Sequence, residues 1–258
     1  MLAYSCYHTE SRSGEQFVSE HSLTYQIAGS LALSDGETTV VSKSDSVVLV
    51  KRNNLVKFIK TPPKGADFES ISLRFSQEIL RAVSLEYNFK AKPTSSNSFP
   101  VVELKMNDLL RSFISSLLAY HRSSKSLSKA MLDLKMKEGI LLLIELKPEL
   151  KNSLFNFSDP HKIDLEAYMN QNFHFNVHLD RFAYLTGRSL ATFKRDFQKI
   201  YGTTPGKWLL HKRLQAAHFL ITERHKNASD IYLDLGFEDL SHFSYAFKKE
   251  FGKAPSRA

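Results

Sequence analysis

The spacing of apolar residues changes close to residue 92, and this change limits the folds open to the chain. Before that point, short β-branched or alternating runs recur with turn residues between them, at intervals of roughly 8–12 residues. The runs are Leu23–Ile27, Leu31–Leu33, Thr38–Val41, Ser46–Val50, Leu55–Lys60 and Phe68–Phe75. This pattern favours a β-sandwich or small barrel over alternating strands and helices.

Beyond a Ser/Pro-rich break at Lys92–Pro100, apolar residues recur every three to four positions, as they do in helices. We predict helices at about 101–121 and 125–147, with a polar break over Ser123–Ser128. Leu141–Ile144 is apolar all round, so the second helix should be buried on more than one face. Core packing and a homodimer seam both remain open for this helix pair.

The chain is therefore predicted to be α+β with two domains. Residues 1–150 would form a β-rich effector or oligomerisation domain, and residues 151–162, which lack periodicity, would form a linker. The strand–glycine–strand stretch Tyr25–Leu33 resembles the entry of cupin-like sensor domains. The interior of such a barrel either holds a small ligand or is filled by side chains. Candidate interior residues are Phe17, Tyr25, Ile27, Val48 and Phe58, but the sequence assigns no ligand-binding residue.

Residues 163–258 contain the same layout twice. A short helix, Leu179–Leu185, is followed by a turn at Thr186-Gly187 and a longer helix from Ser189 to Ile200. The second copy has a short helix ending at Asp234, a turn at Leu235-Gly236-Phe237 and a longer helix from Asp239 to Glu250. Ser189 and Asp239 are placed to cap the longer helices. This layout is typical of helix-turn-helix units.

Each longer helix has an aromatic face and a polar face. We expect Phe193, Phe197 and Ile200 to face the core in the first helix. Phe243, Ala246, Phe247 and Phe251 should do so in the second. The remaining basic and hydrogen-bonding side chains form either a solvated surface or a face that enters a major groove. The presence of two matched units favours the groove-binding interpretation.

The segment between the two helix-turn-helix units is predicted to form one helix from Gly206 to Glu223, preceded by Pro205 at its first turn. A helix of this length spans roughly 28 Å. That length is close to the ~34 Å between major-groove segments on one face of DNA. A connecting helix of this length is therefore suited to hold two DNA-recognition helices about one DNA turn apart.

With these features, residues 163–258 resemble the DNA-binding domain of the AraC/XylS family of bacterial transcriptional regulators. The most specific segment runs from Gly236 through Ser241-His242-Phe243 to Phe251-Gly252 and Pro255. The resemblance implies seven helices and two recognition helices that read neighbouring major-groove segments. The family often has Arg where this chain has Tyr245, which leaves the base preference of the second half-site unpredicted. It often has a small Ala where this chain has Tyr232, so that side chain must be accommodated by repacking.

Carried over by position, the resemblance assigns base contacts to both recognition helices and phosphate contacts to nearby lysines. The base-contact set is Ala191, Thr192, Lys194, Arg195, Leu240, Ser241, His242 and Tyr245, and the phosphate set is Lys199, Lys212 and Lys248.

Charge and composition agree with this interpretation without proving it. The chain carries a net charge of +8, and residues 161–258 hold 15 Lys and Arg against 10 Asp and Glu, which favours an acidic partner. Cys6 is the only cysteine, so we expect no disulfide and no Cys-rich zinc site. No leader peptide or membrane span is apparent.

We therefore predict a cytoplasmic, sequence-specific DNA-binding transcriptional regulator, most consistent with an activator, that is controlled through its N-terminal domain. Its partners would be double-stranded DNA, RNA polymerase, and a small-molecule or protein effector. We expect no catalytic residues, no metal and no cofactor. The alternatives are a cupin-type enzyme with an appended basic domain and a nonspecific nucleic-acid-binding protein.

Overall fold

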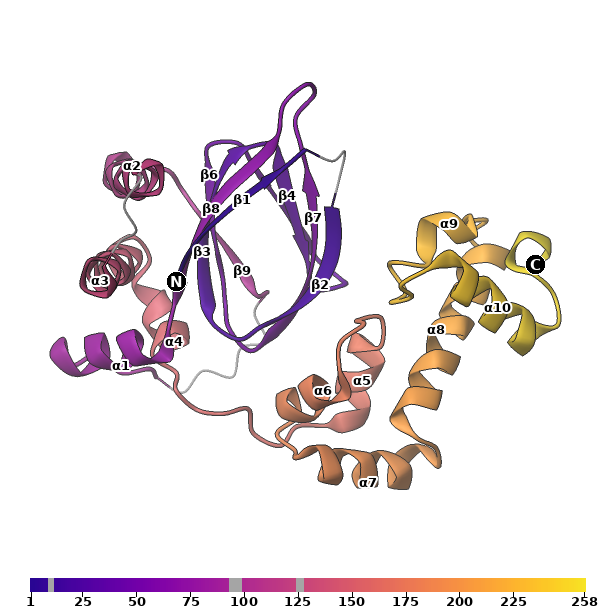
Figure 1. The fold of residues 1–258 in the computed structure, drawn as a ribbon. Helices are drawn as coiled ribbons and strands as arrows, with labels where there is room; N and C mark the ends of the chain where they lie inside the picture. The colour runs from indigo at the N-terminus through magenta and orange to yellow at the C-terminus, as the bar shows by residue number, and fades with distance from the viewer. Residues whose placement is uncertain (9–11, 93–98, 124–127) are drawn as a thin grey trace. The chain divides into compact units, whose positions relative to one another are not determined.

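A computed structural model describes residues 1–8, 12–92, 99–123 and 128–258 (Figure 1). Most of the predicted break at 92–100, the predicted break at 124–127 and the first residues of the second predicted helix lie outside this part of the chain. The chain forms two compact units, Met1–Ser158 and Asp159–Ala258. Each unit has its own hydrophobic core.

The first unit is built on two antiparallel sheets, which confirms the predicted sandwich or barrel. One sheet has the strand order β1-β8-β3-β6-β9 and the other has the order β2-β7-β4-β5. The strands are β1 (Leu2–Tyr7), β2 (Arg12–Val18), β3 (His21–Ala28), β4 (Ser30–Ser34), β5 (Thr39–Lys43), β6 (Ser46–Val50), β7 (Asn54–Thr61), β8 (Phe68–Phe75) and β9 (Val101–Leu104).

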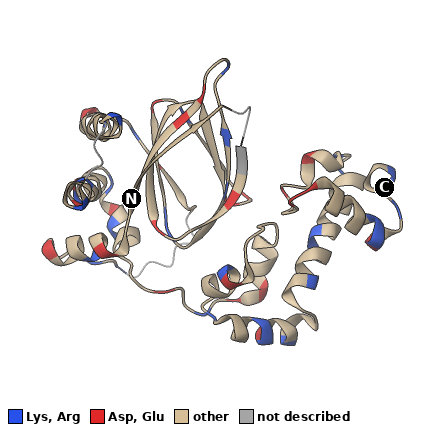
Figure 2. Ribbon diagram, viewed as in Figure 1, with Lys and Arg blue, Asp and Glu red and all other residues tan. Residues whose placement is uncertain are grey.

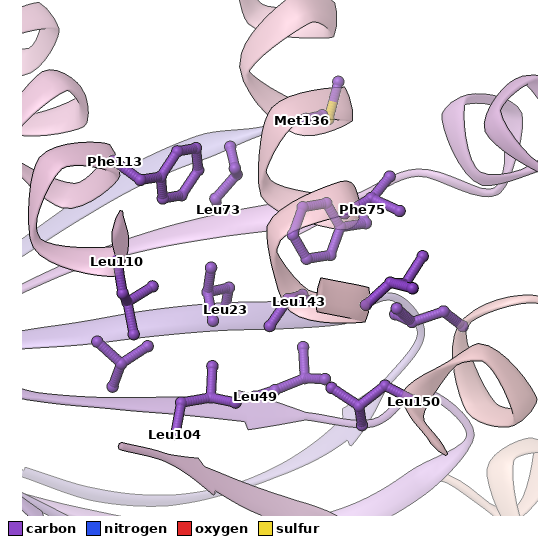
Figure 3. Close-up of a cluster of buried hydrophobic side chains, with 14 of the residues drawn as sticks. Leu23, Leu49, Leu73, Phe75, Leu104, Leu110, Phe113, Met136, Leu143 and Leu150 are labelled. Carbon is purple, nitrogen blue, oxygen red and sulfur yellow. The ribbon is translucent and has the colours of Figure 1, made fainter. Parts of the chain in front are cut away.

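Helices cover the outer face of the five-stranded sheet (Figure 1). They are α1 (Gln77–Glu86), α2 (Asp108–Arg122), α3 (Lys129–Leu146), the 3-10 helix η1 (Pro148–Leu150) and α4 (Lys151–Leu154). Strand β6 is consequently buried on both faces. Its Val47 and Leu49 pack toward these helices, whereas Val48 and Val50 pack between the sheets. Figure 3 shows Leu23, Leu49 and Leu73 of the sheet close to Phe113 and Leu143 of the helices.

Two elements of the first unit differ from the predictions. Residues 101–104 form strand β9 instead of the start of a helix, because their backbone pairs with β6 from Val50↔Val101 to Val47↔Leu104. Helix α1 was not predicted at all. It is capped by Ser76, whose hydroxyl accepts from the Ile79 amide, and it buries Leu80 and Val83.

The predicted linker also differs from the structure at its start. Residues 151–154 form α4, and Leu154 and Phe155 are buried in the core of the first unit. The Arg52 guanidinium donates a hydrogen bond of 3.2 Å to the carbonyl of Ser158. The first unit therefore extends to Ser158 because apolar side chains and a backbone contact hold the 151–158 segment on it.

The interior of the barrel is more polar than expected. Tyr25 and Ile27 do not line it, because alternation along β3 turns them toward the helices, where they pack against the outer core. A cavity of about 150 Å³ lies between the sheets. Its lining includes Thr24, Phe58, Lys60, Ser72 and Arg74.

The second unit is all helical, as predicted. Residues 159–258, all of which the structure describes, form six α-helices and a closing 3-10 helix. They are α5 (Leu165–Asn172), α6 (Leu179–Leu185), α7 (Leu190–Tyr201), α8 (Pro205–Thr222), α9 (Ala228–Ile231), α10 (Leu240–Phe251) and η2 (Pro255–Arg257). Across the described residues of both units, the helices are too short or too polar to span a membrane.

Candidate nucleic-acid interface

The first helix-turn-helix unit consists of α6 and α7 joined by a tight turn. The Gly187 amide donates to the Tyr184 carbonyl and the Arg188 amide to the Ala183 carbonyl, each at 2.9 Å. Gly187 has φ of +65°, and a Cβ at this position would lie 2.3 Å from the His161 carbonyl carbon. Glycine is therefore required both by the left-handed backbone and by the chain that passes against the turn.

The second helix-turn-helix unit, formed by α9 and α10, repeats this turn 49 residues later. The Gly236 amide donates to the Leu233 carbonyl and the Phe237 amide to the Tyr232 carbonyl, each at 3.0 Å. Gly236 also has a positive φ, +81°. Helix α9 ends at Ile231, earlier than the predicted Asp234, because the chain begins to turn there.

The two longer helices have matching beginnings and ends. Each has 12 residues and a side-chain cap: Ser189 accepts from the Thr192 amide at 3.2 Å, and Asp239 accepts from the His242 amide at 2.6 Å. Each is terminated by a left-handed glycine, Gly202 or Gly252. The predicted caps are thus confirmed, and the two helices are equivalent in local structure.

The inner faces of these helices are aromatic. Phe193, Phe197, Phe243 and Phe247 are completely buried. The prediction for Ile200 was wrong, since its side chain is 46% exposed. Tyr201 and Trp208 occupy the space beside Phe197 instead, with ring centroids 4.6 and 5.5 Å from the Phe197 ring.

Most residues of the predicted DNA-contact set lie on the outer faces of the same helices. The exposed members are Ala191, Lys194, Arg195 and Lys199 on α7, and Leu240, Ser241, His242, Tyr245 and Lys248 on α10. Thr192 and Lys212 are half-buried. Thr192 accepts from the Ser189 hydroxyl at 3.0 Å, and Lys212 on α8 lies with Nζ 5.9 Å from the Trp208 ring centroid. Tyr245 is 70% exposed, so its ring is presented to solvent.

Two arginines that the sequence did not single out serve the fold of this region. Arg188 lies behind the first turn with its side chain 6% exposed and donates to the carbonyls of Ile163 and Thr186. Its Nε also donates to Asp196 at 3.1 Å. This hydrogen bond holds the pKa of the Asp196 carboxyl below its usual value, so the ion pair persists at neutral pH.

Arg213 on α8 connects the two helix-turn-helix units. Its Nε donates to the Phe173 carbonyl at 2.8 Å, Nη2 to the Phe175 carbonyl at 2.8 Å and Nη1 to the Gly236 carbonyl at 2.9 Å. Phe173 and Phe175 precede the first unit, whereas Gly236 forms the turn of the second. One guanidinium thereby ties the segment before α6 and the turn before α10 to the connecting helix.

Basic residues gather on the elements that carry the candidate surface. Figure 2 shows Lys and Arg on α7, along α8 and toward the end of α10. Lys207 in the first turn of α8 and Lys253 just after α10 are also exposed and were absent from the predicted set. Both lysines lie close in the sequence to a predicted recognition helix, and this position was a signal that could have identified them.

Two equivalent helix-turn-helix units on one connecting helix, each presenting an exposed second helix, define a DNA-binding transcriptional regulator. Residues 182–258 match the family described as "Helix-turn-helix domain", and residues 21–157, more than half of the chain, match the "ExsA N-terminal regulatory domain" family. The chain belongs to the AraC/XylS family of transcriptional regulators, and its N-terminal part is a regulatory domain of the ExsA type.

Individual relatives and solved structures align with different shares of the chain. The HTH-type transcriptional regulator ExsA of Pseudomonas aeruginosa is 25% identical over 240 residues, covering 90% of this chain and 83% of the relative. The virulence regulon transcriptional activator VirF of Yersinia enterocolitica is 33% identical over 94 residues, covering 36% of this chain and 35% of that protein. A solved structure of ToxT from Vibrio cholerae aligns with a TM-score of 0.43 and 14% identity over 99% of this chain and 97% of that one.

Proposed function

We propose that this regulator recognises a specific duplex site by placing α7 and α10 in successive major-groove segments. The observation that carries the proposal is the equivalence of the two helices in length, cap, terminating glycine and turn hydrogen bonds. Helix α8, with 18 residues, is about 27 Å long. That length suits half-sites about one DNA turn apart.

Within this proposal, the exposed side chains divide by chemistry into base and phosphate contacts. Arg195 and Lys194 suit guanine, and Ser241, His242 and Tyr245 offer hydrogen bonds or stacking to the second half-site. Lys199, Lys212 and Lys248 would neutralise phosphates, Ala191 and Leu240 would make apolar contacts, and Thr192 would lie beside them.

We further propose that residues 1–158 control this activity in the cytoplasm and that the protein activates transcription through RNA polymerase without any enzymatic step. The name of VirF describes that relative as an activator. The cavity between the sheets has room for a small molecule, while the outer helices offer a surface for a protein effector or a second copy of the chain.

Arg195→Ala tests the assignment of the first recognition helix. We expect operator binding to weaken by about 1–3 kcal/mol and selectivity to relax at one base pair, because a bidentate contact with guanine is lost. The operator is obtained by recovering bound genomic fragments, and affinity is measured by fluorescence anisotropy at fixed salt.

The matched control for Arg195→Ala is Arg224→Ala. Arg224 is exposed after the end of α8, so this variant removes the same charge away from both recognition helices. If Arg195→Ala retains the affinity and selectivity of the parent, the assignment of α7 as a reading helix is wrong. Equal affinity of the parent for random duplexes would instead support nonspecific binding.

Lys248→Gln tests the second recognition helix in a different way. A lysine that contacts phosphate contributes to affinity but not to selectivity. We expect weaker binding on all sequences and a salt-dependence slope reduced by about 1. A salt titration of operator and random duplexes measures both quantities, and an unchanged slope would exclude Lys248 from the phosphate contacts.

A further inference from the structure

The ends of β1 and β8 bring together three side chains with metal-binding chemistry. Cys6 lies on β1 and His8 follows that strand, so alternation places both on one face. Asp67 immediately precedes β8, and the pairing Tyr7↔Phe68 brings it next to His8. His8 Nδ1 lies 2.6 Å from Asp67 Oδ1, and Cys6 Sγ lies 3.8 Å from Asp67 Oδ2.

We propose that Cys6, His8 and Asp67 form a binding site for a divalent transition-metal ion, with Zn²⁺ as the expected occupant. A thiolate, an imidazole and a carboxylate are the three protein ligand types that zinc uses. One ligand atom from each residue lies within 4.8 Å of the others. Atoms bound to one tetrahedral zinc ion lie roughly 3.3–3.8 Å apart, as follows from bond lengths of about 2.0–2.3 Å.

The surroundings of the three residues favour a bound cation. Cys6 and His8 are exposed, so small side-chain rotations suffice to close the ligand set and solvent can supply a fourth ligand. Cys6 pairs directly with Glu69, which places a second carboxylate on the same face of the sheet. The Tyr4 hydroxyl donates to Glu69 and holds it there. Two carboxylates, Asp67 and Glu69, therefore lie beside Cys6 and His8.

A metal at this position would act as a staple. Strand β1 is the edge strand of the five-stranded sheet and pairs only with β8 among the described strands. A bound ion would join the end of β1 to the start of β8 and resist fraying of the N-terminal strand.

The experiment is a titration of the untagged, full-length protein with Co²⁺, followed by displacement with Zn²⁺. Because Cys6 is the only cysteine in the chain, a thiolate-to-cobalt charge-transfer band can arise only from this site. We expect the band to saturate at one Co²⁺ per chain and to disappear on addition of Zn²⁺. Zn²⁺ should also raise the unfolding temperature of the parent protein.

Three variants distinguish a metal site formed by all three residues from binding of the ion by the Cys6 thiol alone. Cys6→Ser should abolish the band, whereas His8→Ala and Asp67→Asn should each weaken Co²⁺ binding at least ~10-fold. The matched control is His211→Ala, because His211 pairs with Glu250 at 2.7 Å in the same way but has no cysteine beside it. Circular dichroism without metal confirms that each variant is folded. Absence of the band, or a band unaffected by His8→Ala and Asp67→Asn, would overturn the proposal.

Discussion

Replacing Gly187 by alanine is expected to destabilise the first helix-turn-helix unit by about 3 kcal/mol or more. Two costs combine at this position. The left-handed backbone, with φ of +65°, costs an L-residue about 1–2 kcal/mol. In addition, the new Cβ would lie 2.3–2.5 Å from backbone atoms of His161 and Lys162, so the passing chain would have to move. We expect loss of DNA binding to accompany the loss of stability.

Gly202→Ala provides the control for Gly187→Ala. Gly202 has the same φ of +65°, but among the described residues, its immediate chain neighbours aside, no heavy atom lies within 4 Å of a Cβ built there. Its substitution should therefore show only the backbone cost, about 1–2 kcal/mol. Trp208 is the only tryptophan in the chain, and its ring centroid lies 4.8 Å from that of Tyr201, so its fluorescence reports unfolding of this unit. Equal destabilisation by the two variants would show that the close approach of residues 161–162 does not matter.

Replacing Arg213 by methionine is expected to loosen the connection between the two helix-turn-helix units. The variant keeps most of the apolar stem but removes three charge-assisted hydrogen bonds to the carbonyls of Phe173, Phe175 and Gly236. Those carbonyls are partly buried and would be left without their donor. We expect a loss of about 2–4 kcal/mol in the stability of the second unit of the chain, residues 159–258.

The functional consequence of Arg213→Met should be a change in spacing preference. The parent protein should lose affinity when base pairs are inserted between the half-sites, because α8 and Arg213 hold the two recognition helices at one spacing and orientation. Arg213→Met should bind the natural operator more weakly but discriminate less between spacings. Arg224→Met, which removes a guanidinium outside this network, should leave both properties unchanged. If Arg213→Met keeps the parental stability and spacing preference, Arg213 does not position the helices.

The predicted elements of the second unit agree with the structure because their signals are local. Ser189 and Asp239 cap helices that begin one residue later, and Pro205 begins α8 as expected. The positive φ of Gly187 and Gly236 follows from turns within a few residues of each glycine. The DNA-contact set remains a prediction, although nine of its members are exposed on α7 and α10.

The first unit was less predictable because its boundaries depend on distant partners. Val101–Leu104 shows apolar spacing that continues into a helix, yet it forms β9 because β6 offers an unpaired edge. Leu154 and Phe155 lie in the predicted linker, but they are buried in the core of the first unit. The alternation along β3 does not show which of its faces the helices cover, so the sequence alone does not assign Tyr25 and Ile27 to the outer face.

Local signals in the sequence are enough to establish the character of the two domains, the two recognition helices and the family, because caps, turn glycines and hydrophobic periodicity act over a few residues. The tertiary structure decided which charged and metal-binding side chains meet. Arg213 reaches carbonyls on both sides of it, 38 to 40 residues before and 23 residues after. Asp67 comes to His8 across 59 residues of chain. Such contacts depend on strand register and helix packing, which no local pattern specifies.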